Sequence, residues 1–179
     1  QELTYALLWR GGPLLLNGIT AVMSGFAAGF LALAGKEISC LTSRVDASKI
    51  NAPVLGALIF AFTPVIFINS VNSMDYMWAI TFILGSLYLT LVKKTILAGL
   101  LLGLAIGTRL TSVVMLLPLI LVLLHQGVLR KDVVKFTLIS ILVGGLFYIP
   151  ALATYGTGFI KYHPGRQIPL ASILTKATV

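Results

Sequence analysis

The stretch TILAGLLLGLAIGTRLTSVVMLLPLILVLL, Thr95–Leu124, decides the fold because it is almost wholly apolar yet carries one charge, Arg109, near its middle. One long membrane span would bury this arginine, which costs roughly 2.5–3.5 kcal/mol on insertion scales. Two helices that meet at Arg109 would each have about 14 residues and a length near 21 Å. That length is short of the roughly 30 Å hydrocarbon core of a bilayer. In this hairpin, Arg109 would lie below the membrane surface, at the floor of a wet cavity.

The composition of the whole chain indicates a membrane location. Hydrophobic residues make up 58% of the chain and charged residues 10%, whereas soluble domains carry about 25% charged residues. Because so few charges cannot cover a water-facing surface, we exclude a soluble domain and predict an all-α polytopic transmembrane bundle. The net charge of +8 does not indicate a nucleic-acid partner, since the basic residues form short clusters between apolar runs, where topology signals occur.

Six apolar runs predict six membrane segments, two of them short and forming the hairpin around Arg109. We expect segments at residues 13–34, 52–71, 76–92, 95–108, 111–125 and 136–154, followed by an outer-side tail at residues 155–179. Pro64 lies inside the second segment and should kink it, because proline has no backbone donor. Gly25 and Gly29 lie four residues apart in the first segment, which favours the close approach of a neighbouring helix.

The distribution of basic residues favours the hairpin over one long span. If the polar loop at residues 36–49 lies inside, the hairpin puts a further set of basic residues on the same side: Lys93, Lys94, Arg130, Lys131 and Lys135. One long span would move the Arg130–Lys135 cluster outside and remove the bias that the positive-inside rule describes. The hairpin also places Asp75 and Arg109 at helix ends on the outer side.

Asp75 and Arg109 are therefore the strongest candidates for a functional role. Ionisable residues in or near a membrane are candidates for ligand binding by default. The structural alternative is that Asp75 caps the helix that follows it and that Arg109 extends its charge to the interface. The very apolar flanks of Arg109 favour a functional role for this residue.

A glycine stripe leads along the sequence to Arg109. Gly99, Gly103 and Gly107 repeat every four residues and would lie on one face of a helix. Such stripes favour close helix packing. The functional alternative is a smooth groove beside the arginine that admits a lipid tail.

The polar tail carries a small basic patch formed by Lys161, His163 and Arg166. It is either a solvated loop or a contact for phosphate or sugar. His163 alone is weak evidence for a metal, and His125 fits a boundary role at the inner end of its helix. Cys40 is the only cysteine, which excludes a disulfide framework and a cysteine-based metal site.

The order of these elements resembles a known membrane superfamily. A span that opens with PLLLN is followed by a proline-containing span that ends in the turn NSVNSMDY. A third span, a basic pair and the segment LAGLLLGLAIGTRLTSVVMLLPLILVLL come next. Over residues 11–154 this pattern is similar to the membrane core of the GT-C glycosyltransferases, the superfamily of protein O-mannosyltransferases and aminoarabinose transferases.

This resemblance implies that a sugar passes from a polyprenyl-phosphate donor to an acceptor on the outer face of a prokaryotic plasma membrane. Arg109 matches the basic position that faces the lipid phosphate, and a guanidinium can bind phosphate bidentately. Asp75 matches an acidic position that helps to bind a divalent metal or to position the acceptor. The superfamily's main catalytic carboxylate has no match here. We expect it upstream of Gln1, which would make this sequence an inactive fragment of a longer enzyme.

Two other classes of function remain open from the residues themselves. A transporter or permease for an anionic substrate would suit the kinks expected at Pro64 and Pro150 and the charge of Arg109. A structural or assembly subunit of the membrane would need no chemistry at Arg109.

Overall fold

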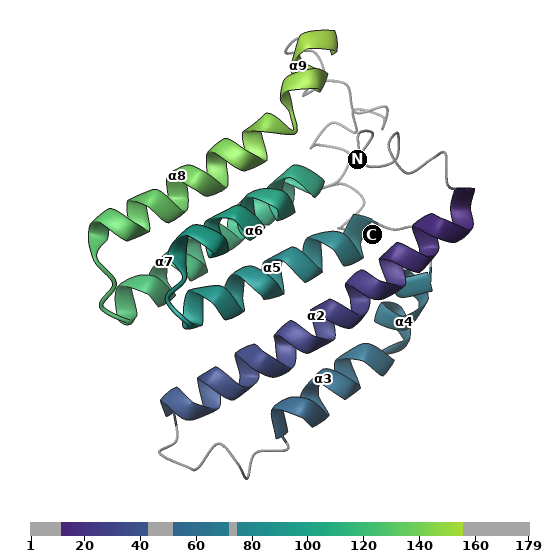
Figure 1. Cartoon of the computed structure of the whole chain (residues 1–179), viewed down its shortest axis with the longest axis horizontal. Helices are drawn as coiled ribbons and strands as arrows, with labels where there is room; N and C mark the ends of the chain where they lie inside the picture. The colour runs from purple at the N-terminus through teal and green to yellow at the C-terminus, as the bar shows by residue number, and fades with distance from the viewer. Residues whose placement is uncertain (1–11, 43–51, 72–74, 156–179) are drawn as a thin grey trace, which may run out of the picture. The chain divides into compact units, whose positions relative to one another are not determined.

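The computed structural model describes residues 12–42, 52–71 and 75–155, and in these ranges the backbone forms helices and turns with no strand (Figure 1). The chain divides into two units, residues 1–147 and residues 148–179. The helices from α2 to α8 belong to the first unit. The expected all-α fold is therefore confirmed for the described residues.

Helix α2 (Gly12–Thr42) does not end at Ala34, where we expected the first segment to stop. The following sequence, GKEISCLT, contains no proline, so nothing in it interrupts the backbone hydrogen bonds of the helix. Among the described helices, only α2, through Leu14–Leu41, is by itself long and apolar enough to cross a membrane.

None of the remaining described helices is long and apolar enough to cross a membrane by itself. Ala52–Phe62 and Pro64–Ser70 meet the same length and hydropathy criterion as a bent pair, whereas Tyr76–Leu91, Thr95–Thr108 and Leu110–His125 are shorter apolar helices. A bundle of six membrane segments therefore stays a prediction.

Pro64 separates two helices, as the sequence predicts. Helix α3 (Ala52–Phe62) ends just before it, and helix α4 (Pro64–Val71) begins with it. The two axes differ by 66°. The proline ring has no N–H to continue the hydrogen bonds of α3, but it suits the first turn of a new helix.

Helix α5 (Asp75–Leu91) packs between α2 and α6 (Figure 1). Hydroxyl groups join α5 to α2, since the Trp78 indole N–H donates to Thr20 Oγ1 at 3.2 Å and Thr81 Oγ1 lies 2.8 Å from the carbonyl oxygen of Met23. A Cβ at Gly85 would lie only 2.7 Å from Leu101 Cδ1. A small residue at position 85 is therefore part of the close contact between α5 and α6.

The predicted glycine stripe lies on α6 (Thr95–Thr108) and packs against α8 (Arg130–Leu146). A Cβ at Gly103 would lie 2.6 Å from Val143 Cβ, and one at Gly107 would lie 2.6 Å from Phe147 Cδ2. These distances are shorter than carbon atoms can approach without a shift of structure. The packing interpretation is confirmed, and the alternative of a groove that admits a lipid tail is wrong because α8 fills the stripe.

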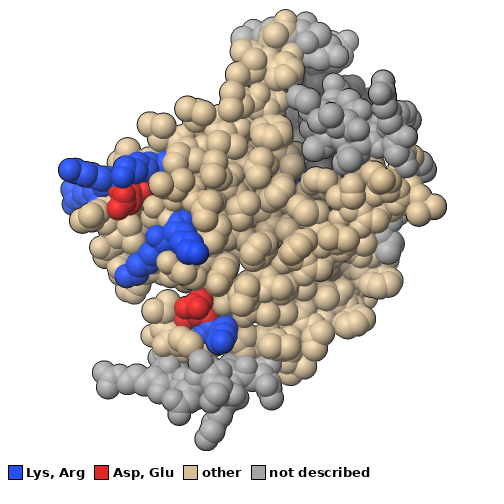
Figure 2. Space-filling view, viewed as in Figure 1, with Lys and Arg blue, Asp and Glu red and all other residues tan. Residues whose placement is uncertain are grey.

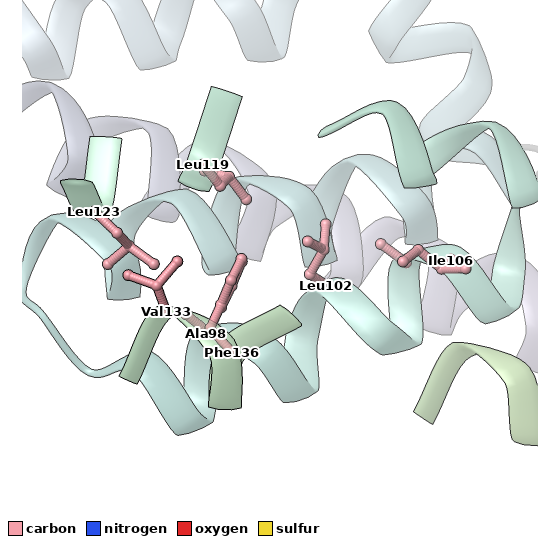
Figure 3. Packing of buried hydrophobic residues seen from close by; sticks show 8 residues of the cluster. Ala98, Leu102, Ile106, Leu119, Leu123, Val133 and Phe136 are labelled. Carbon is pink, nitrogen blue, oxygen red and sulfur yellow. The ribbon is translucent and has the colours of Figure 1, made fainter. Parts of the chain in front are cut away.

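After α6 the chain returns along helix α7 (Leu116–His125). Leu119 and Leu123 of α7 share one apolar core with Ala98 and Leu102 of α6 and with residues of α8 (Figure 3). The side-chain amide of Gln126, just after α7, lies 3.4 Å from the carbonyl oxygen of Leu91, the last residue of α5, from which a short turn leads into α6. The end of α7 thus returns to the level at which α6 begins, which is the geometry of a hairpin.

Helix α8 begins at Arg130 and not at Phe136, where we expected the last segment to start. Its first turn contains Asp132, which suits the positive end of the helix dipole. The helix ends at Leu146 because Pro150 has no N–H to donate to the Leu146 carbonyl group. In the second unit, α9 (Ile149–Tyr155) begins with this proline in its first turn.

The basic residues of the first unit gather along one edge, which we call the basic edge (Figure 2). It comprises all the described lysines and arginines except Arg109, and each of them is exposed: Lys36, Lys93, Lys94, Arg130, Lys131 and Lys135. Much of the other described surface consists of exposed leucine, isoleucine, valine and phenylalanine side chains. Water-soluble monomers rarely expose so much contiguous apolar surface, and this distribution agrees with a lipid environment.

Helices α5 and α7 both end at the basic edge in the same turn. After α5, Lys94 N–H donates to the Leu89 carbonyl group and Lys93 has φ 62°. After α7, Val128 N–H donates to the Leu123 carbonyl group and Gly127 has φ 69°. This is the Schellman motif, which normally places glycine in the left-handed conformation. The chain therefore has a lysine where glycine would be free of strain.

We expect Lys93→Gly to raise the free energy of unfolding by about 1 kcal/mol, because it removes the Cβ that opposes a positive φ. Gly127→Ala should lower that free energy by a similar amount. Lys93→Ala is the matched control, since it loses the same charge but keeps a Cβ. Thermal unfolding of the full-length protein in detergent measures all three variants. Equal stability of Lys93→Gly and Lys93→Ala would contradict the explanation.

Candidate functional site

The helical hydrogen bonds end at Arg109, at the tip of the α6–α7 hairpin. The Arg109 N–H still donates to the Ala105 carbonyl group at 2.9 Å, but Arg109 itself has extended dihedral angles, φ −144° and ψ 116°. Residues Leu110–Met115 then form a 3₁₀-helix, here called η3. Pro118 cannot donate to the Val114 carbonyl group, so regular α-helix does not extend back to Arg109. The sequence-based prediction of two helices that meet at Arg109 agrees with this geometry.

The guanidinium of Arg109 stacks on the ring of Tyr76. Its Cζ atom lies 3.5 Å from the ring centroid, which is well within the range of a cation–π interaction. Tyr76 lies in the first turn of α5, whose start is attached to α2 by the hydrogen bond of Trp78. Arg109 is half-buried, and Tyr76 is 48% exposed. The pair therefore joins two helix ends at a partly accessible position.

Asp75 is the first residue of α5 and directly precedes Tyr76. Its backbone thus lies at the same end of the helices as Arg109, whereas its side chain lies outside the described part of the structure. A shared role for Asp75 and Arg109 stays a prediction. A carboxylate in the first turn would also favour α5 through the helix dipole.

Stacking determines what the Arg109 guanidinium can do chemically. The N–H groups of a guanidinium lie in its plane. A ring that stacks on its face fixes this plane, and therefore fixes the direction in which the N–H groups can donate. An oriented guanidinium suits the bidentate binding of a phosphate or carboxylate. Arg109 also stabilises the fold, because it follows the C-terminal end of α6, where a cation interacts favourably with the helix dipole.

The other predicted site residues are not brought to Arg109. Lys161, His163 and Arg166 lie outside the described residues. His125 is exposed in the last turn of α7, near the basic edge and away from the tip of the hairpin. In the part of the chain that the structure describes, no group of three His, Cys, Asp or Glu residues could hold a metal ion.

Tyr76 is the site residue that sequence reasoning missed. Its position at the start of an apolar run is typical of an aromatic residue at a membrane interface. An interfacial role does not predict a contact with another side chain of the protein. The available signal was the hairpin itself, because the hairpin returns Arg109 to the level of the turn before α5. An aromatic residue at that turn is a suitable neighbour for an arginine.

One protein family matches this chain. The model of that family, described as "GPI transamidase subunit PIG-U", matches residues 4–166 of the 179 residues. No curated protein and no solved structure matches the chain. The matched range contains both Tyr76 and Arg109.

Proposed function

Because the chain belongs to the PIG-U family of GPI transamidase subunits, we propose that it is a membrane-embedded subunit of such a transamidase. We propose further that the end of the bundle at Arg109 binds the phosphate of the glycosylphosphatidylinositol lipid. The family match over residues 4–166 is the observation that carries the first proposal. The stacked Arg109 is the observation that supports the second.

The family agrees with only part of what the sequence suggested. It is a multi-pass membrane family related to GT-C-like proteins, so the resemblance is correct at that level, and the membrane location is correct. Sugar transfer from a polyprenyl phosphate gains no support, and neither does a prokaryotic plasma membrane, since the family is eukaryotic and belongs to the endoplasmic reticulum. The alternative of a structural or assembly subunit fits the family best, and membrane-protein partners replace a prenyl-linked sugar.

A phosphate group is common to the substrate that the sequence resemblance implies and to the substrate that we propose for the transamidase subunit. A polyprenyl-phosphate sugar and a glycosylphosphatidylinositol both carry a phosphodiester next to a lipid. Arg109 is half-buried beside an aromatic ring at the end of an apolar bundle, where reduced hydration strengthens a charge-assisted hydrogen bond. The proposed role of Arg109 is to hold the substrate lipid and needs no bond to be made or broken there.

A replacement experiment tests the subunit proposal. The full-length protein would carry an affinity tag and replace the native PIG-U subunit in eukaryotic cells. We expect the other transamidase subunits to co-purify with it and GPI-anchored proteins to return to the cell surface, as measured by flow cytometry. If the protein reaches the membrane but captures no transamidase subunit, the proposal is wrong. If the complex assembles normally but GPI-anchored proteins do not return, the subunit proposal stands and only the proposed role of the Arg109 site in GPI attachment is rejected.

A further inference from the structure

An apolar groove opens at the basic edge, at the opposite end of the helices from Arg109. Its volume is about 450 Å³, and it lies between the end of α2 and the end of α7. The apolar walls come from three helices: Ile38 and Leu41 of α2, Leu91 of α5, and Leu121 and Val122 of α7. This volume is within the range of sites that hold small molecules or parts of larger ones.

Polar residues complete the lining of this groove, and two lysines follow one of its walls in the sequence. His125 and Gln126 line it directly. The hydrogen bond from Gln126 to the Leu91 carbonyl group brings the α5–α6 turn, which carries Lys93 and Lys94, beside the same opening. Figure 2 shows lysine and arginine side chains along this edge, on the left of the view, beside a surface of uncharged residues. The groove therefore has mostly apolar walls, and the exposed Lys93 and Lys94 follow two and three residues after one of them, Leu91.

Two details at or near this groove favour a ligand. Lys93 occupies a left-handed position at which glycine would be free of strain, so the chain keeps a positive charge there against a local conformational cost. The Gln126 Oε1 atom is buried and has no hydrogen-bond partner among the described residues, although buried polar atoms are normally satisfied. A ligand that carries both a negative charge and hydrogen-bond donors would meet both conditions.

We propose that this groove binds one anionic glycerophospholipid of the surrounding membrane, with an acyl chain against Leu121 and Val122 and the headgroup at Lys93, Lys94 and Gln126. Serine or inositol headgroups combine the negative charge with donors. A transmembrane helix of another subunit would fill an apolar groove equally well, but it would interact favourably with the lysines only through an acidic residue or its C-terminal end. A soluble anion would gain nothing from the apolar walls. This inference does not depend on what Arg109 binds.

Photolabelling of the assembled complex tests the proposal. The complex would be placed in phosphatidylcholine nanodiscs with a trace of phosphatidylserine that carries a photoreactive acyl chain, and the labelled peptides would be identified by mass spectrometry. We expect label on the segments around residues 38–41 and 121–126, several times stronger than with phosphatidylcholine that carries the same reactive chain. Lys93→Gln and Lys94→Gln should each reduce this preference about fivefold, the effect of one basic side chain near an anionic lipid.

Two further variants separate a specific site from general contact with lipid. Val122→Trp should fill the groove and reduce labelling by both lipids. Lys135→Gln is the control on the same edge, since Lys135 pairs with Asp132 at 3.1 Å, and it should leave the preference unchanged. Co-purification of the other subunits verifies that each variant assembles. Equal labelling by the two lipids, or a preference that survives loss of both lysines, would overturn the proposal. A crosslink from position 122 to another subunit in place of lipid would also overturn it.

Discussion

Gly103→Leu is expected to abolish the folded bundle, with a loss of about 3 kcal/mol or more of unfolding free energy. The Cβ alone would lie 2.6 Å from Val143 Cβ and 3.1 Å from the Ser140 carbonyl oxygen. Neither atom is the flexible end of a side chain, so α6 and α8 would have to separate. Their separation would also break the hydrogen bond from Ser140 Oγ to the Gly99 carbonyl group, 3.2 Å. Size-exclusion chromatography of the fluorescently tagged full-length protein after a heating series measures the loss.

Neighbouring glycines of α8 provide a matched control for this prediction. Gly144→Ala should destabilise the protein, because its Cβ would lie 2.7 Å from Ile106 Cγ2. Gly145→Ala should be neutral or stabilise by up to about 1 kcal/mol, since nothing described lies within 4 Å of that Cβ and alanine favours a helix. If the two alanine variants unfold at the same temperature, the contact between α6 and α8 does not depend on glycine in the way the structure indicates.

Arg109→Ala is expected to reduce GPI attachment about tenfold to a hundredfold, the range for loss of one hydrogen-bonded contact to a charged group. The reason is that the guanidinium stacked on Tyr76 is the oriented cation at this end of the helices. The amount of GPI-anchored protein on cells that depend on the variant measures the effect. Arg109→Lys should recover only part of the activity, because an ammonium keeps the charge but cannot bind phosphate bidentately.

Assembly and substrate binding must be separated in this test. Each variant should capture the other transamidase subunits as the unaltered protein does, because Arg109 lies at a helix end and is only half-buried. Arg130→Gln, an exposed arginine on the basic edge, is the control and should leave GPI attachment unchanged. Full activity of Arg109→Ala would reject the phosphate role, whereas a joint loss of capture and activity would assign Arg109 to the structure of the subunit.

Several features of the fold were predictable because they follow from local chemistry. Pro64 lacks a donor, so a break at that position requires no knowledge of neighbouring helices, and the structure has a 66° bend there. The charge of Arg109 within thirty nearly apolar residues predicted two helices in place of one, and α6 ends at Thr108. The boundaries of α2 and α8 were less predictable, because charged residues such as Lys36 and Arg130 can extend a helix beyond its apolar part.

The sequence by itself therefore determined the all-α class, the apolar character of the bundle, the breaks at Pro64 and Arg109, and the presence of a glycine stripe. Only the tertiary structure decided what these features meet. The glycine stripe of α6 packs against α8 and does not line a groove for lipid. The reason is that α6 and α8 lie side by side, although α7 comes between them in the sequence. Tyr76 meets Arg109 although the two residues are 33 positions apart along the chain. Periodicity and charge act within one helix, whereas the partner of a side chain depends on how distant helices pack.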